Sequence, residues 1–156
     1  MDQSDAALAS TELRRLLDEQ AVRDACMRYW AGFDRRDVAV YREAFTPDAT
    51  LSLFGGERVV PVADMLASGS VGGQFEHTCH APASQVVEVD GDRATADTFV
   101  VAHLVPEEGP ILVRGLRYRD ELVRTEQGWR IRLREHMTLW QYDVERVEPH
   151  LPVTGP

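Results

Sequence analysis

The stretch Glu76–Pro82, read as EHTCHAP, gathers two of the five histidines and one of the two cysteines of the chain. Such residues serve three kinds of chemistry: metal binding, thiol nucleophilicity and general base catalysis. The alternating sequence that follows is typical of a β-strand, in which successive side chains point to opposite faces. His77 and Cys79 should therefore share one face, and Thr78 and His80 the other.

This alternation weakens the case for a metal or a reactive thiol. A zinc site needs three or four converging ligands, and the chain has no H-E-x-x-H or C-x-x-C pattern to supply them. We expect no metal. His77 could activate Cys79 as a basic neighbour on the same face. A lone strand cysteine is more often a small buried hydrophobe, and the same interpretation holds for Cys26.

The remaining chemistry is that of one base, His80. A histidine becomes an effective base when a carboxylate fixes its tautomer and orientation. Asp34 is the candidate partner, because it follows Phe33 on the apolar stripe at the inner end of a predicted helix. Tyr29 lies one turn earlier and could donate a proton in the same cavity. The alternatives are a core aromatic for Tyr29 and a helix-end or salt-bridging residue for Asp34.

The elements that must position these residues begin with a long helix. Val22, Cys26, Tyr29 and Phe33 follow one another at steps of four, three and four, which is one face of an α-helix. Ser10 or Thr11 is predicted to cap its start, and Gly32 to weaken its end. A second short helix is predicted after a cap at Asp37, then a turn over residues 46–49, then a short strand. A further short helix is predicted to open with Pro61.

From Phe75 the pattern predicts long antiparallel strands. Asp-Gly within Asp90–Asp92 is a strong hairpin signal, and acidic, glycine-containing turns follow at residues 106–110 and 126–128. Helices followed by hairpins indicate an α+β fold, with helix 1 across a curved mixed sheet and a cavity between them. We expect one domain over residues 1–156, with residues 1–9 and 149–156 as flexible ends.

The last predicted strand raises a question of side-chain direction. Trp129, Ile131 and Leu133 alternate with arginines and should face the core. Arg134 and His136 would then face solvent, unless a bulge re-aims the strand near its end. We favour His136 as a pocket residue, with Trp140 and Tyr142 at the mouth of the pocket.

The composition excludes several classes of partner. A formal net charge of −9 repels phosphate backbones and anionic lipids, so we expect neither nucleic acid nor membrane partners. The first ten residues lack the basic and apolar regions of a signal peptide, and no apolar run approaches the roughly 20 residues that span a bilayer. Two cysteines without a spacing pattern fit a cytoplasmic protein with reduced thiols.

Three segments carry a resemblance to a known family: RYWAGFDRRDVAVYREAFTPDATL, HTCHAPASQVVEVDGDRATA and GLRYRDELVRTEQGWRIRLREH. Together they resemble the SnoaL-like family of the nuclear transport factor 2-like superfamily, with the site pattern of its scytalone dehydratase and bile acid 7α-dehydratase types. The resemblance implies a cone-shaped fold with a deep pocket. It also implies an Asp34–His80 pair, assisted by Tyr29 and Arg134, and a pocket that includes Phe33.

The resemblance further implies a lyase, most often a dehydratase, that needs no cofactor and acts on a small hydrophobic cyclic substrate such as a polyketide or steroid. Isomerisation or cyclisation by the same pair is an alternative, and so is a non-catalytic ligand-binding or dimerisation module. Epoxide hydrolysis is weaker, because the strand carboxylates show no grouping of the required kind. We also expect self-association into a homodimer or a larger homo-oligomer.

Overall fold

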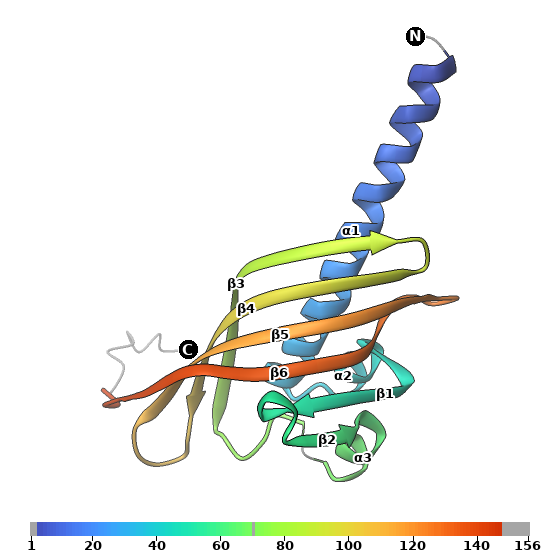
Figure 1. Ribbon diagram of the computed structural model, residues 1–156. Helices are drawn as coiled ribbons and strands as arrows, with labels where there is room; N and C mark the ends of the chain where they lie inside the picture. The colour runs from blue at the N-terminus through green and yellow to red at the C-terminus, as the bar shows by residue number, and fades with distance from the viewer. Residues whose placement is uncertain (1–2, 70, 148–156) are drawn as a thin grey trace, which may run out of the picture.

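The computed structural model describes residues 3–69 and 71–147 of the chain. Three helices and a short 3₁₀ turn accompany six strands in the order shown in Figure 1. The helical elements are α1 (Gln3–Arg35), α2 (Val38–Glu43), η1 (Phe54–Gly56) and α3 (Val62–Ala67). The strands are β1 (Phe45–Leu53), β2 (Arg58–Pro61), β3 (His77–Asp90), β4 (Arg93–Val105), β5 (Ile111–Thr125) and β6 (Gly128–Val144).

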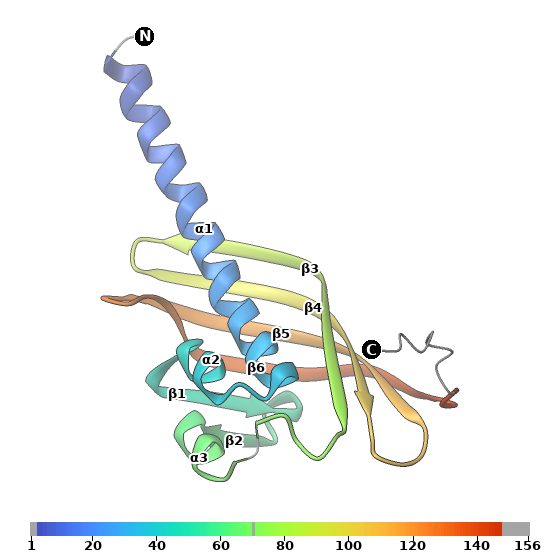
Figure 2. The same ribbon diagram turned by 180° about the vertical axis from the view of Figure 1, so that it is seen from behind.

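The six strands form one curved, open sheet in the order β2-β1-β6-β5-β4-β3. Strand β1 runs parallel to β6, whereas the other neighbours are antiparallel, so the sheet is mixed. Helix α1 crosses one face of this sheet, behind the strands in Figure 1 and in front of them in Figure 2. The predicted α+β class, with N-terminal helices on a curved mixed sheet, is confirmed.

The core fills the space between α1 and the sheet face that it covers, which we call the inner face. Val22, Cys26 and Tyr29 of α1 are buried there, as the helical spacing predicted. From the sheet, alternate residues of β4 and β5 complete the core, so the inner positions can be followed residue by residue: Ala94, Ala96, Thr98, Val100, Ala102, Leu104, Leu116, Tyr118, Asp120 and Leu122.

Helix α1 begins earlier than the sequence indicated. It includes residues 3–9, which were expected to belong to a flexible end, and it contains Ser10 and Thr11 instead of starting at them. The Thr11 hydroxyl donates to the Ala7 carbonyl at 3.0 Å, one turn back in the helix. The alanine-rich sequence here favours helix continuation, which explains why the predicted caps are not used. The other predicted flexible end, residues 149–156, lies outside the described residues.

Helix α2 packs tightly against the end of α1. Its predicted cap is confirmed, because the Asp37 carboxylate accepts from the backbone N–H groups of Ala39 and Val40, each at 3.1 Å. At Gly32, an added Cβ would lie only 2.4 Å from the backbone nitrogen of Tyr41. Gly32 therefore permits the close approach of the two helices, and α1 continues past it to Arg35. The turn predicted at residues 46–49 is wrong, since these residues lie within β1.

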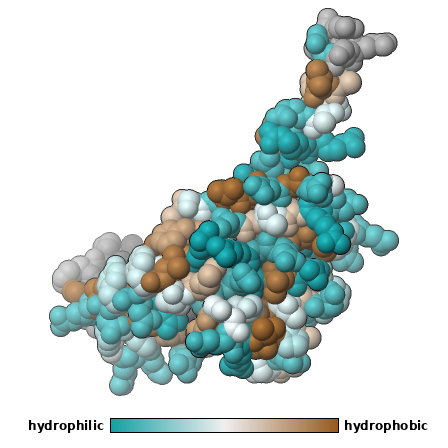
Figure 3. Space-filling model, viewed as in Figure 1, coloured by the Kyte–Doolittle hydropathy of each residue, from teal (hydrophilic) through white to brown (hydrophobic). Residues whose placement is uncertain are grey.

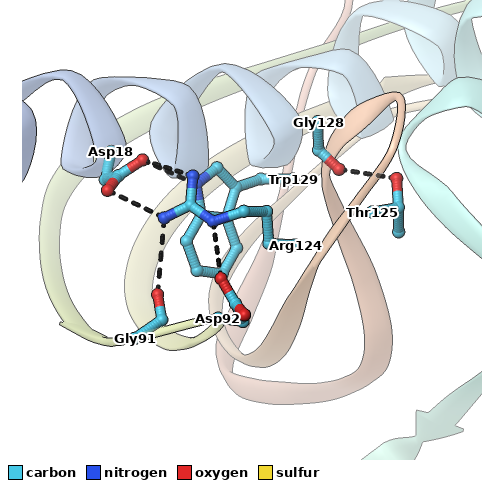
Figure 4. A network of polar contacts seen from close by, with 7 residues as sticks. All are labelled: Asp18, Gly91, Asp92, Arg124, Thr125, Gly128 and Trp129. Atoms are coloured by element: carbon cyan, nitrogen blue, oxygen red, sulfur yellow. Dashed lines mark hydrogen bonds and ion pairs between the residues drawn. The ribbon is translucent and has the colours of Figure 1, made fainter.

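The three predicted hairpin turns connect β3 to β6, and one arginine joins the β3–β4 and β5–β6 hairpins to α1 (Figure 4). The Arg124 guanidinium donates to both carboxylate oxygens of Asp18 on α1, at 2.7 and 2.8 Å. It also donates to Asp92 in the β3–β4 turn at 2.9 Å and lies 4.6 Å above the ring of Trp129. This cluster fixes the direction in which α1 crosses the sheet.

A bulge at Arg132 changes which side chains of β6 face the core. Leu122 pairs with Ile131 and Glu121 pairs with Leu133, so Arg132 is an extra residue on its strand. Alternation restarts after it. Leu133, which was expected in the core, consequently faces outward, and Arg134 and His136 face inward opposite Asp120 and Tyr118. The bulge occurs earlier in the strand than the sequence analysis allowed for.

Candidate functional site

Asp34 and His80 meet at the end of α1. The Asp34 Oδ1 atom lies 2.6 Å from His80 Nδ1, and Asp34 Oδ2 accepts from the His80 backbone N–H at 2.7 Å. The Thr78 hydroxyl donates to Asp34 Oδ1 at 2.8 Å. Thr78 and His80 share the inner face of β3, so the alternation that separates them from His77 and Cys79 also brings both of them to the carboxylate.

This arrangement fixes the tautomer of His80. With Asp34 deprotonated, Nδ1 carries the hydrogen and donates it, which leaves Nε2 as the basic nitrogen. Nε2 has no hydrogen-bond partner within residues 3–69 and 71–147. The Phe33 ring contacts the imidazole edge-on, with centroids 5.4 Å apart, and only 6% of the His80 side chain is exposed. The imidazole is therefore oriented, enclosed and unsatisfied at one nitrogen.

The Asp34 carboxylate is held in its charged form. Partial burial by itself raises the pKa of Asp34, but the hydrogen bonds from His80 and Thr78 and the charge interaction with His80 outweigh it. The net effect is a pKa of Asp34 below its ordinary value. An ionised Asp34 can stabilise a protonated imidazole, which is the state that His80 reaches after accepting a proton.

Tyr29 lies in an aromatic cluster beside this pair. Its ring stacks on Phe33, with centroids 6.3 Å apart, and meets Tyr118 edge-on at 5.8 Å. Burial raises the pKa of Tyr29, so its hydroxyl keeps its proton at neutral pH. The burial of Tyr29 confirms its interpretation as a core aromatic, whereas its role as a proton donor beside His80 stays a prediction.

Arg134 is enclosed beneath Tyr29. It donates two hydrogen bonds of 2.7 Å to Asp120, and neither side chain is exposed. Its guanidinium lies 4.0 Å from the centroid of the Tyr29 ring. Arg134 was expected to contact substrate, and this expectation needs correction: Asp120 already neutralises its charge. The cause is the bulge, which turns Arg134 into the core instead of toward an opening.

His136 also faces inward and stays neutral. Its ring lies 5.2 Å from that of Tyr118, and its Nδ1 atom is buried without a hydrogen-bond partner in the described structure. Burial, followed by the positive charges of Arg114 and Arg134, lowers the pKa of His136 to about 4. The inner face therefore presents a second uncharged imidazole.

Trp140 and Tyr142 lie on the outer face of the sheet, opposite to the face of His80. A second bulge, at Leu139, pairs Trp140 with Gly115 and Tyr142 with Val113, on the outer face of the sheet. The two rings stack on each other with centroids 5.7 Å apart. The prediction that they line the mouth of the pocket therefore needs correction.

Cys79 is exposed, contrary to its interpretation as a buried hydrophobe, while Cys26 is buried as expected.

Three inward-facing residues were not predicted as residues of the site: Thr78, Asp120 and Arg114. Strand parity could have found the first two, since Thr78 is two residues from His80, and Asp120 alternates with Tyr118 and Leu122. Arg114 has the same parity as Leu112 and Leu116, but the outward-facing Val113 is also apolar, so alternation gives a weaker signal there. Within the described parts of the chain, no three His, Cys, Asp or Glu residues converge in a way that could hold a metal ion.

The comparisons with known proteins place this chain in a family. The family model for the SnoaL-like domain matches residues 14–135, and the chain belongs to that family. An uncharacterised protein of Mycobacterium tuberculosis is 30% identical over 119 residues, covering 73% of this chain and 80% of the relative. The resemblance to the SnoaL-like branch of the nuclear transport factor 2-like superfamily is thereby confirmed.

Solved structures share the fold at lower identity. A hexachlorocyclohexane dehydrochlorinase of Novosphingobium barchaimii superposes with a TM-score of 0.76 at 17% identity, over 88% of this chain and 99% of that one. A proposed scytalone dehydratase of Novosphingobium aromaticivorans gives a TM-score of 0.74 at 19% identity, over 90% of this chain and 96% of that one. These likenesses establish the fold.

Proposed function

We propose that this chain is a cofactor-independent lyase of the dehydratase type, in which Asp34 and His80 form the general base. The observation that carries this proposal is the pairing itself: Nδ1 of His80 is held at 2.6 Å by an ionised carboxylate while Nε2 has no partner. A buried imidazole that is oriented in this way is suited to abstracting a proton.

The reaction begins with removal of a proton from a carbon adjacent to a carbonyl group of the substrate. Nε2 of His80 accepts the proton, and Asp34 stabilises the resulting imidazolium. The electron pair moves to the carbonyl oxygen as an enolate and then returns to expel a β-hydroxyl group. A proton from the imidazolium converts that group into water, or Tyr29 donates the proton and its phenolate then regains one from the imidazolium. The atoms balance without any cofactor, because the carbonyl accepts the developing charge.

The aromatic residues beside the pair support a hydrophobic cyclic substrate. Phe33 contacts His80, and Tyr29 and Tyr118 continue the aromatic surface inward. A dehydrochlorinase and a proposed scytalone dehydratase share this fold, which is consistent with elimination chemistry. Isomerisation and cyclisation begin with the same proton abstraction, so product analysis separates them from dehydration.

The location and assembly are part of the proposal. Two free cysteines, one of them exposed, support a cytoplasmic location with reduced thiols. No described helix has the length and apolar character needed to cross a membrane. We also propose that the chain associates with itself through the outer face of the sheet, where Trp140 and Tyr142 are exposed.

The test is turnover of cyclic β-hydroxy ketones, followed by the ultraviolet absorbance of the enone product. We expect His80→Ala and Asp34→Asn to lower kcat/KM roughly 100- to 10,000-fold, as is usual for loss of a general base. His77→Ala, which removes the exposed neighbour on the opposite face of β3, is the matched control and should retain activity. Full turnover in both His80→Ala and Asp34→Asn would refute the proposal.

A further inference from the structure

Arg114 lies in the same row of the sheet as His80. In the strand register, His80 pairs with Ala102, Ala102 pairs with Arg114, and Arg114 pairs with Gln141. Directly paired residues point to the same face of a sheet, and Ala102 belongs to the buried core. His80 and Arg114 therefore both project from the inner face, one on each side of Ala102.

Only a methyl group separates them on the intervening strand. Two strand spacings place the backbones of His80 and Arg114 about 10 Å apart, and Ala102 contributes no side chain beyond its Cβ. An arginine is long enough to reach back across part of this distance. A small ligand that touches Nε2 of His80 can therefore also reach the guanidinium.

Arg114 has no partner of its own. Its Nε–H is shielded from solvent and donates to no acceptor. Within residues 3–69 and 71–147, the side chain of Arg114 forms neither a hydrogen bond nor an ion pair. The other inward-facing arginine of β5 and β6, Arg134, is fully neutralised by Asp120. A cation that is partly withdrawn from water and left without an acceptor is unusual, because charged donors are normally paired when buried.

The positive charge of Arg114 also acts on the inner face. Together with burial and with Arg134, it lowers the pKa of His136, so that His136 adds no charge of its own. Asp34 is occupied by Thr78 and His80. Among the described residues, the guanidinium of Arg114 thus has no carboxylate in contact with it, although the whole chain has a formal net charge of −9.

We propose that Arg114 determines substrate specificity by binding a carboxylate of the substrate, across Ala102 from the base His80. The guanidinium presents parallel N–H donors that match a carboxylate in a bidentate pair. The substrate is then a cyclic keto acid, with its carboxylate on Arg114 and its acidic carbon facing His80. The position of the reacting carbon rests on the proposed function, whereas the carboxylate site rests on Arg114 alone.

The experiment compares a carboxylate with its neutral ester. Binding of 3-oxocyclohexanecarboxylate and of its methyl ester is measured by NMR titration of the isotope-labelled protein. We expect the wild-type protein to bind the acid roughly tenfold more tightly than the ester, or better, as a charge-assisted pair would give. Arg114→Gln should remove this preference and leave ester binding unchanged, and Arg114→Lys should keep part of it.

Arg117→Gln is the matched control, because Arg117 lies on the same strand, faces outward and pairs with Asp97. It should bind both probes as the wild-type protein does. A thermal midpoint of Arg114→Gln equal to or above that of the wild-type protein shows that the variant is folded. Equal affinity for acid and ester, an unaltered preference in Arg114→Gln, or no detectable binding of the acid would each overturn the proposal.

The same titration separates this proposal from the proposed function. In His80→Ala the preference for the acid should persist, because the imidazole takes no part in the ion pair. Loss of the preference in Arg114→Gln, combined with full turnover in His80→Ala, would uphold the carboxylate site and refute the general base. An unaltered preference in Arg114→Gln, combined with loss of turnover in His80→Ala, would refute the carboxylate site and uphold the general base.

Discussion

Asp34 accepts three hydrogen bonds, which act on its pKa together with the charge interaction with His80. They hold the pKa of Asp34 below its ordinary value against the opposing effect of burial. Because the folded pKa is lowered, the carboxylate stabilises the fold above its unfolded pKa of about 3.9. That stabilisation is lost as the pH falls through the lowered value. Asp34 therefore remains charged throughout the range in which a histidine can act as a base.

His136 makes the stability of the protein depend on pH in a different range. The pKa of His136 is about 4 in the folded chain and about 6.5 when unfolded. Between these values the unfolded state binds more protons, so the free energy of unfolding decreases as the pH is lowered from about 6.5 toward about 4. The loss amounts to about 3 kcal/mol, at 1.36 kcal/mol for each pKa unit.

We predict that His136→Gln removes this contribution to the pH dependence. Chemical denaturation at several pH values between 4.5 and 8 measures it. His77→Gln is the matched control, since His77 is exposed and should leave the pH dependence as it is in the wild-type protein. An unchanged slope below pH 6.5 in His136→Gln would show that His136 is not the group responsible.

At the scale of elements, the approach of α2 to α1 positions the candidate site. Asp34 lies two residues after Gly32, where the backbone of Tyr41 comes so close that an added Cβ would meet its nitrogen at 2.4 Å. Asp37, three residues further on, begins α2 through its cap. The direction in which α1 ends is therefore set by the packing of α2, and Asp34 is held by that packing.

We predict that Gly32→Ala destabilises the protein by about 1–3 kcal/mol, the usual cost of an overpacked interior. The clash involves backbone atoms, so it can be relieved only if α2 moves. The displacement should also disturb the contact between Asp34 and His80. Denaturant unfolding measures the first effect, and the chemical shifts of the His80 imidazole measure the second. A variant with wild-type stability and unchanged His80 shifts would contradict this account of the helix packing.

The sequence predicted the helices and strands better than it predicted which side chains of a strand face the core. The helical spacing of Val22, Cys26 and Tyr29 and the Asp-Gly hairpin depend on local periodicity, which is visible in a single sequence. The bulge at Arg132 depends on pairing with β5, a contact between distant segments, and it reversed the predicted direction of Leu133. The second bulge, at Leu139, likewise reversed the predicted direction of Trp140.

The residues of the candidate site also differ in how far local sequence patterns could predict them. His80 and Thr78 could be assigned to one face of the strand by alternation. Asp34 could be placed at the inner end of α1 because it directly follows Phe33 in the sequence. Arg134 could be recognised but not interpreted, because its partner Asp120 lies on another strand. The position of Arg114 beside Ala102 depends on the register between β4 and β5, which the sequence alone does not reveal.

At the scale of the whole molecule, the two faces of the sheet differ. The inner face is covered by α1, whereas the outer face, seen in Figure 3, carries apolar side chains (brown) among hydrophilic ones. A hollow of about 770 Å³ on the outer face is lined in part by Val86, Phe99 and Leu139. Apolar surface on an open sheet of this kind suits the proposed self-association.

We predict that the protein is at least dimeric, and that Val86→Glu combined with Tyr142→Glu shifts it to a monomer. A stable interface needs to bury about 800 Å² on each partner, and two charges placed within it oppose that burial. Light scattering coupled to size-exclusion chromatography measures the mass. Val59→Glu, at an exposed position on β2, is the control. A wild-type protein that elutes as a monomer at high concentration would contradict the proposed assembly.

The most direct test of the Asp34–His80 base needs no knowledge of the natural substrate. Exchange of the α-protons of a cyclic ketone in D₂O, followed by proton NMR, reports proton abstraction alone. We expect the wild-type protein to accelerate this exchange, Asp34→Asn to slow it strongly, and His80→Ala to abolish the acceleration. Exchange that is equally fast in the wild-type protein and in His80→Ala would contradict the assignment of His80 as the base.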